Sequence, residues 1–182
     1  MGVVCPSWLS FILYNPLRKI FTDRGKVLEE SGITYDSVVL EVGAGNGFFT
    51  EVLAEHSRKV YSVEVQNGMV RKLKKRVARF GDRVSILECD IATCGIEDKV
   101  ADVCLTYYSF HEVKDKSGAV KAISRALKEG GLLSVHEPTI EVNARGMRNT
   151  VEMFENAGFR KEGERNGLFT RFAKLRKPGG GA

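Results

Sequence analysis

Short apolar runs alternate with longer amphipathic segments along the middle of the chain. The runs with the length and composition of buried strands are 38–42, 59–65, 84–88, 101–107 and 131–136. Between them, apolar residues recur at helical spacing in three segments, 48–55, 67–80 and 115–127. Strands that alternate with helices predict a parallel sheet with helices packed against it.

The pattern changes in the last part of the chain. A helix is expected over 147–156, and two strands over 159–164 and 168–175 flank the turn Asn166-Gly167. An Asn-Gly pair between two strand patterns is typical of a β-hairpin. The last strand should therefore run antiparallel at or near the end of an otherwise parallel sheet. Residues 178–182 are expected to form a loose tail.

The composition is that of one folded domain. The 182 residues give room for one hydrophobic core, and 43% of them are hydrophobic and 28% charged. The four cysteines, Cys5, Cys89, Cys94 and Cys104, contain no Cys-x-x-Cys pair. We therefore expect buried thiols and no metal site. Free thiols favour a reducing, cytoplasmic compartment.

The chain is basic, with a formal net charge of +5 and a pI near 9.0. The densest group of bases lies within 67–80 and consists of Arg71, Lys72, Lys74, Lys75, Arg76 and Arg79. The same segment carries Val70, Leu73 and Val77 at helical spacing, so the bases fall on the opposite, solvated face. A nucleic-acid surface is the alternative, although no aromatic stacking motif accompanies these bases.

A glycine-rich turn, Gly43-Ala44-Gly45-Asn46-Gly47, joins the first predicted strand to the helix that follows it. In open α/β sheets, ligands bind beyond the carboxyl ends of the strands, where glycine lets the backbone approach the ligand. Glu64 and Asp90 mark the ends of the next two strands. Glu64 can accept hydrogen bonds from both hydroxyls of a ribose, and Asp90 from an adenine amino group. Together these features indicate a nucleoside-containing cofactor.

A dinucleotide dehydrogenase uses similar features, because its glycine turn is also followed by an acid about 20 residues later. Its fingerprint requires a further glycine five residues after the first. Phe48 occupies that position here. A pyrophosphate would therefore lose its close approach to the start of the helix.

From about Val38 to the final strand, the chain resembles the class I S-adenosylmethionine-dependent methyltransferases. The matching segments are VLEVGAGNGFFT, VYSVEV, ECDI, LTYYSFHEV and LKEGGLLSVHEP. The resemblance implies a doubly wound, Rossmann-like α/β fold over 32–177, with a mostly parallel seven-stranded sheet and an antiparallel last strand. It implies S-adenosylmethionine as the cofactor and S-adenosylhomocysteine as the product. The most similar subgroup is the small-molecule methyltransferases that include quinone-ring methylating enzymes.

The resemblance also assigns roles to residues around the turn. Glu41 would orient the glycine loop, Glu64 would hold the ribose, and Asp90 would flank the adenine. The residues expected to bind the cofactor are Glu41, Gly43, Ala44, Gly45, Glu64, Val65, Met69, Asp90, Ile91 and Tyr107.

Methyl transfer from a sulfonium depends mainly on alignment and on exclusion of water, and it needs no metal. If the acceptor must lose a proton, the loop after the fourth strand offers His111 and Tyr108 as catalytic candidates. His111 could equally be a polar partner of the backbone. Of the adjacent Tyr107 and Tyr108, only one is expected to face the pocket, since neighbouring strand residues point to opposite faces. The segment His136-Glu137-Pro138 lies at the same edge and could face the substrate.

Three functions stay open at this point. The leading one is a methyltransferase that acts on a small-molecule acceptor. A protein or RNA methyltransferase is favoured by the positive charge and by the short 137–145 connection, which leaves little room for a substrate-binding insertion. A non-catalytic cofactor-binding subunit is the third, although the glycine turn and both acids argue against a degenerate pocket.

Residues 1–31 differ in character from the rest of the chain. The run Trp8 to Tyr14 (WLSFILY) is strongly apolar. It has no preceding basic region and is shorter than the roughly 20 residues that span a bilayer, so we expect neither a secretion signal nor a membrane span. Such a run should be buried against something. We expect 1–31 to form a mobile helical lid over the cofactor, with a homodimer contact as the second interpretation and a membrane surface as the third.

Overall fold

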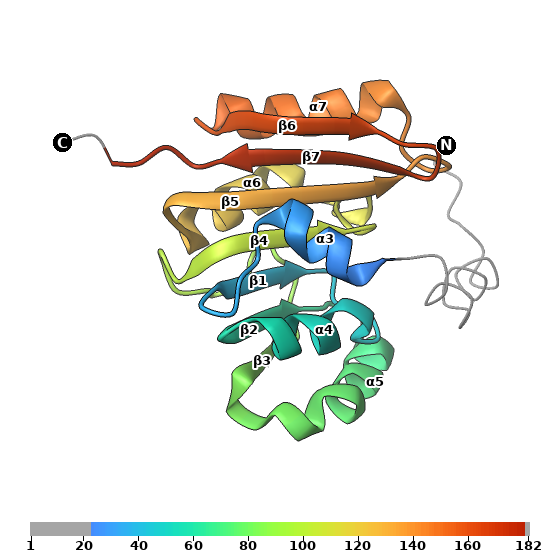
Figure 1. Ribbon diagram of the computed structural model, residues 1–182, viewed down its shortest axis with the longest axis vertical. Helices are drawn as coiled ribbons and strands as arrows, with labels where there is room; N and C mark the ends of the chain where they lie inside the picture. The colour runs from blue at the N-terminus through green and yellow to red at the C-terminus, as the bar shows by residue number, and fades with distance from the viewer. Residues whose placement is uncertain (1–22, 181–182) are drawn as a thin grey trace.

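The computed structural model describes residues 23–180, which form a seven-stranded sheet with helices on both faces (Figure 1). The strands are β1 (Val38–Val42), β2 (Lys59–Val63), β3 (Val84–Leu87), β4 (Ala101–Tyr107), β5 (Leu127–Pro138), β6 (Arg160–Asn166) and β7 (Thr170–Arg176). The α-helices are α3 (Arg24–Ser31), α4 (Phe48–His56), α5 (Asn67–Val77), α6 (Lys116–Ala126) and α7 (Ala144–Asn156). Two short 3₁₀ helices, η1 (Ala78–Arg83) and η2 (Phe110–Glu112), follow α5 and β4.

The strand order is β3-β2-β1-β4-β5-β7-β6. The first five strands in this order pair in parallel, and β7 pairs antiparallel with both β5 and β6. This confirms the predicted α/β class, the mostly parallel sheet and the reversed last strand. The hairpin around Gly167 places β7 inside the sheet and β6 at its edge.

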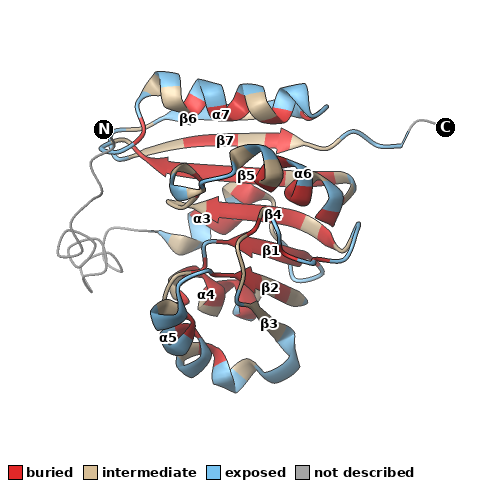
Figure 2. Cartoon of the chain, turned by 180° about the vertical axis from the view of Figure 1, so that it is seen from behind, coloured by how far each residue is buried: buried red, intermediate tan, exposed pale blue. Residues whose placement is uncertain are grey.

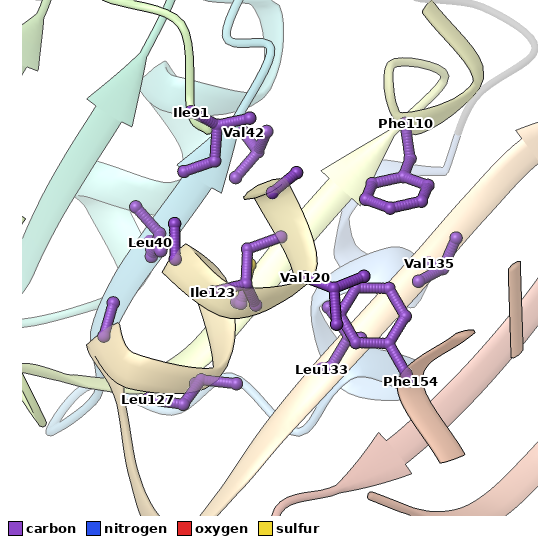
Figure 3. Packing of buried hydrophobic residues seen from close by; sticks show 14 of the residues in the cluster. Leu40, Val42, Ile91, Phe110, Val120, Ile123, Leu127, Leu133, Val135 and Phe154 are labelled. Carbon is purple, nitrogen blue, oxygen red and sulfur yellow. The ribbon is translucent and has the colours of Figure 1, made fainter. Parts of the chain in front are cut away.

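The core lies in two layers on either side of the sheet. The larger layer packs α6 and α7 against it, with Ile123, Leu133 and Phe154 among its buried side chains (Figure 3). The other layer packs α3 and α4 against the opposite face. All five residues of β1 are buried, as expected for a central parallel strand covered on both faces. Figure 2 shows buried strands between helices whose outer faces are exposed.

Helix α3 packs against the sheet within the domain. Asp23 caps its start by accepting a hydrogen bond from the backbone of Lys26, and Val27 and Leu28 are buried in the layer shared with α4. At its end, the Ser31 hydroxyl lies 2.7 Å from that of Ser134 on β5. Thus residues 24–31 of the predicted lid form a helix of the core. Residues 1–22 lie outside the described residues, so the lid prediction now concerns them alone.

Two of the cysteines correct an expectation. Cys89 and Cys94 are joined in a disulfide across the turn that follows β3, so the prediction of free thiols is wrong for this pair. The turn brings their Cα atoms within 5.5 Å, which their sequence separation alone did not reveal. Cys104 is a free, buried thiol, and burial raises its pKa. Cys5 lies outside the described residues. The expectation of a reducing compartment rested on free thiols, and the Cys89–Cys94 disulfide does not support that expectation.

Within residues 23–180, no helix is long and apolar enough to cross a membrane. The same part of the chain holds no cluster of three or more His, Cys, Asp or Glu side chains placed to bind a metal ion. Residues 178–180 form neither helix nor strand, and the end of the predicted tail, 181–182, is not described.

Candidate cofactor site

A cavity of about 420 Å³ opens at the carboxyl ends of the parallel strands. Its volume lies in the range of small-molecule sites, roughly 300 to 1,000 Å³. Of the residues predicted to bind the cofactor, those that line the cavity are Gly43, Glu64, Val65, Asp90 and Ile91. They come from the ends of β1, β2 and β3, so the fold brings together the three features that the sequence placed at successive strand ends.

The glycine turn is clamped between β2 and the loop after β4. The backbone N–H groups of Gly43 and Ala44 both donate to the carbonyl of Val63, at 2.9 and 3.0 Å. On the other side, the Ser109 hydroxyl donates to the carbonyl of Val42 at 2.6 Å. A Cβ added to Gly43, whose φ is +76°, would lie 2.3 Å from the Cβ of Ser109. The turn can lie this close to Ser109 only because residue 43 has no side chain.

Glu64 ties the end of β2 to the glycine turn. Its carboxylate accepts a hydrogen bond from the backbone of Gly45 through Oε2 and one from Gln66 through Oε1, both at 2.7 Å. The side chain is buried and lines the cavity. Each carboxylate oxygen can accept a second hydrogen bond, so Glu64 keeps the capacity to hold two ribose hydroxyls.

Asp90 begins the turn that the Cys89–Cys94 disulfide closes. Its Oδ1 accepts a hydrogen bond from the backbone of Ala92 at 2.9 Å, and the carbonyl of Asp90 accepts one from Thr93 at 3.0 Å. These bonds fix the carboxylate at the cavity wall between Cys89 and Ile91.

Glu41 lies beneath the glycine turn and is not part of the cavity lining. Its Oε2 accepts hydrogen bonds from the hydroxyls of Thr50 on α4 and Ser62 on β2, at 2.6 and 2.8 Å. Burial raises the pKa of Glu41 from 4.5 to about 7, although these two hydrogen bonds oppose the shift. Glu41 therefore joins α4 to β2 below the turn. From this position it can orient the glycine loop, which is the role that the resemblance implied.

Several other predicted residues also lie outside the cavity lining. Ala44 is buried against α5, and Gly45 is bound to Glu64. Met69 is half-buried on α5. Tyr107 packs against Phe49 and lies in the layer beneath α3 and α4, whereas Tyr108, just past the end of β4, lines the cavity.

His136, suggested above to face the substrate, is fully buried. Its Nε2 lies 3.0 Å from the Ser134 hydroxyl, and its ring packs against Tyr107 and Phe172. Burial lowers the pKa of His136 to about 3, so this imidazole stays neutral. The expectation for His136 is therefore corrected: the side chain belongs to the core under the sheet edge.

Tyr108 lines the cavity from an unusual backbone conformation. Its φ of 56° is rare for a bulky residue, and its N–H donates to the carbonyl of His136 at 2.8 Å. Its hydroxyl pairs with that of Thr170 on β7 and lies 3.4 Å from the carbonyl of Phe169. The ring is thus fixed between the cavity and the β6–β7 hairpin.

His111 is held by two glutamates, Glu137 and Glu141, whose contacts with it were not predicted from the sequence. Glu137, at the end of β5, accepts from the backbone N–H of His111 at 3.0 Å, and its Oε2 lies 2.5 Å from the ring Nδ1. Nε2 lies 2.5 Å from Oε2 of Glu141, a close charge contact without the alignment of a hydrogen bond. Burial lowers the pKa of His111, but Glu137, Glu141 and Glu112 outweigh it, and the net shift is upward.

The residues at the acceptor side of the cavity include Ser109, Glu112, Lys114 and Glu141, none of which was predicted. His111 itself is not among the lining residues, although its neighbours are. The available signal was the pair of short segments Phe110-His111-Glu112 and His136-Glu137-Pro138, since both follow predicted strands. Only the parallel pairing of β4 with β5 shows that they meet.

The cavity is acidic although the chain is basic. Four carboxylates, from Glu64, Asp90, Glu112 and Glu141, line it together with one lysine, Lys114. The bases of α5 lie elsewhere. That helix buries its apolar stripe and exposes its basic face, which confirms its predicted amphipathic pattern.

Comparisons with known proteins agree with this site. Residues 40–135, more than half of the chain, match the sequence model of a family described as a methyltransferase domain. An uncharacterised methyltransferase of Geobacillus is 28% identical over 144 residues, which cover 78% of this chain and 66% of that protein. A probable S-adenosylmethionine-dependent methyltransferase of Mycobacterium tuberculosis is 27% identical over 55% of this chain and 35% of its own length.

Solved structures share the fold. An S-adenosylmethionine-dependent methyltransferase from Aquifex aeolicus superimposes with a TM-score of 0.79 and 24% identity, over 90% of this chain and 94% of that one. The N-methyltransferase NodS of Bradyrhizobium japonicum, solved with S-adenosylhomocysteine, has a TM-score of 0.73 and 19% identity, over 90% and 89% of the two chains. This chain spans just under two thirds of the Geobacillus relatives it matches. By its fold and its family match, the chain belongs to the class I S-adenosylmethionine-dependent methyltransferases.

Proposed function

We propose that the protein transfers a methyl group from S-adenosylmethionine to a small-molecule acceptor. The observation that carries this proposal is the cavity bounded by Gly43, Glu64 and Asp90 at three successive strand ends. These residues fit the cofactor, because Glu64 and Asp90 both line the cavity and the Glu64 carboxylate retains free acceptor capacity. When bound, the cofactor supplies a methyl group on a cationic sulfur that is a good leaving group.

The chain's own residues would bind and orient the two substrates. Glu64 would accept hydrogen bonds from the ribose, and Asp90 from the adenine amino group. Val65 and Ile91, which both line the cavity, would offer apolar cover for the purine. Tyr108, fixed by its hydroxyl, would close the opposite wall and help exclude water.

The acidic lining favours a neutral or cationic small molecule as the acceptor. Four carboxylates facing one cavity would repel the phosphates of RNA, whereas they would attract a cation. The exposed bases of α5 remain the feature that favours a nucleic-acid acceptor. Because those bases do not line the cavity, we favour a small molecule over a nucleic acid as the acceptor.

Proton removal from the acceptor is assigned to the carboxylates that line the cavity. Glu112 and Glu141 both do so, and burial raises the pKa of Glu112 despite the opposing charge of His111. A carboxylate with a raised pKa is a stronger base. His111, whose own pKa is raised, would stay cationic to higher pH and hold Glu141 in place by charge attraction. In this proposal His111, held by Glu137, positions Glu141. Tyr108 forms part of the cavity wall and takes no part in proton transfer.

The test compares Glu64→Ala with Glu88→Ala, which removes an exposed acid just after β3. Calorimetry should show that Glu64→Ala weakens cofactor binding by about 1 to 3 kcal/mol, the scale of charge-assisted hydrogen bonds. Glu88→Ala should bind like the parent. Equal affinities for all three proteins would contradict the assignment of Glu64 to the ribose.

The acceptor class needs a second experiment. The protein is incubated with cell extract and radiolabelled S-adenosylmethionine, and the label is sought in small molecules, protein and RNA. Label in small molecules that is lost in Glu64→Ala supports the proposal. Label in protein or RNA would identify a macromolecular methyltransferase, and tight cofactor binding with no transfer would identify a non-catalytic subunit.

A further inference from the structure

Three large apolar side chains stand exposed beside the cavity. Ile140, Leu168 and Phe169 are 84%, 88% and 82% exposed. Ile140 follows β5, and the other two form the turn of the β6–β7 hairpin. We call these three residues the hairpin patch. Grouped apolar side chains on a surface usually mark a place where something binds.

The hairpin patch is held in place by its backbone. Thr139, next to Ile140, donates from its N–H to the carbonyl of Phe169 at 3.1 Å and from its hydroxyl to that of Leu168 at 2.8 Å. Tyr108, which lines the cavity, is bonded to Thr170 in the same hairpin. The two loops are therefore joined to each other and to the cavity wall.

The described part of the chain begins at the same end of the strands as the hairpin patch. Arg24, the first residue of α3, donates to the carbonyl of Phe48, the first residue of α4 after the glycine turn, at 2.9 Å. Figure 1 shows the start of α3 and the turn of the β6–β7 hairpin at the same end of the molecule. Twenty-two residues precede Asp23, and they include the apolar run Trp8 to Tyr14.

We propose that the run Trp8 to Tyr14 docks on the hairpin patch. The eight residues 15–22 can span up to about 26 Å when extended, at roughly 3.3 Å per residue, which allows the run to reach along one edge of the sheet. A second copy of the chain is a poorer occupant, because a stable dimer buries about 800 Å² on each partner, far more than three side chains provide. Docked there, the run would border the cavity next to Pro138 and Tyr108.

Trp8 makes the proposal testable, because it is the single tryptophan of the chain. In the full-length protein, its fluorescence should be blue-shifted and protected from acrylamide. The double substitution Leu168→Ser with Phe169→Ser should shift the emission to the red and raise the quenching constant severalfold. Tyr35→Ser, which removes another exposed aromatic away from the hairpin patch, is the matched control and should leave both unchanged.

Circular dichroism verifies that each variant is folded, and Ile140→Ser repeats the test from the neighbouring loop. Free quenching of Trp8 in the parent, or equal quenching in parent and hairpin variants, would overturn the proposal. Protection that disappears on dilution, with dimers in sedimentation, would assign the patch to a second copy. Protection that arises only with phospholipid vesicles would assign the run to a membrane surface. The test involves neither cofactor nor acceptor, so it stands or falls independently of the proposed reaction.

Discussion

Gly43 lies where the structure has no space for any side chain. A Cβ there would approach the Cβ of Ser109 to 2.3 Å, and the backbone φ of +76° disfavours every residue except glycine. We expect Gly43→Ala to cost about 1 to 3 kcal/mol of the free energy of unfolding and to weaken cofactor binding at least about tenfold. Thermal unfolding and calorimetry measure the two effects.

Gly163→Ala is the control for this substitution. Gly163 lies in β6, where an added Cβ would meet no atom within 4 Å and no positive φ is required. The stability and cofactor affinity of the Gly163→Ala variant should match those of the parent. If Gly43→Ala behaves like Gly163→Ala, the close approach of the turn to Ser109 does not limit the site.

The sequence was informative wherever a residue's role depends on its own strand. Glu64 and Asp90 were recognised because each follows a strand pattern, and both line the cavity. The contacts of Glu137 and Glu141 with His111 were missed because only the pairing of β4 with β5 brings these side chains together. Tyr107 was wrongly assigned to the cavity. The sequence predicted that only one of Tyr107 and Tyr108 faces it, but it did not show which one.

Helix α5 is anchored by one fully buried leucine. Leu73 packs with Ala44 and Val77, and the glycine turn runs close to it, since a Cβ on Gly47 would lie 2.8 Å from its side chain. Leu73→Ala should lower the free energy of unfolding by about 2 to 5 kcal/mol. Lys72→Ala, on the exposed face, should change it by less than about 0.5 kcal/mol. Urea unfolding tests both, and similar losses would contradict the assigned orientation of the helix.

The boundaries of the elements show where local patterns stop being sufficient. The fourth strand was predicted over its observed range, Ala101–Tyr107, because this segment (ADVCLTY) is short and mostly apolar. The fifth strand is longer at both ends than predicted, since β4 and β7 pair with it beyond the apolar core. The helix expected to reach residue 80 ends at Val77 and continues as η1, where Gly81 leaves the helical conformation.

At the scale of the whole molecule, Glu41 makes stability depend on pH. Burial raises its pKa from 4.5 to about 7, so the folded state keeps a proton that the unfolded chain releases in this interval. The stabilisation is fully present below the lower value and is lost as the pH rises through the upper one. The total loss is about 3 kcal/mol.

Glu41→Gln removes the titrating group but keeps an oxygen that can accept from Thr50 and Ser62. Relative to this variant, the parent should lose about 3 kcal/mol of the free energy of unfolding between about pH 4 and pH 8. Urea unfolding at several pH values measures the difference, in which contributions from other groups cancel. Parallel pH curves for the two proteins would show that Glu41 titrates normally.

Within residues 23–180, the open sheet leaves two strands without a neighbour on one side, and both are poor templates for a foreign chain. β3 spans only Val84–Leu87, and β6 reads Arg-Lys-Glu-Gly-Glu-Arg-Asn with nearly every residue exposed. Short or highly charged borders discourage strand addition and self-aggregation. The hairpin that reverses the end of the sheet thus places its exposed, charged strand outside and its more buried strand, β7, within, which favours a protein that stays dispersed at high concentration.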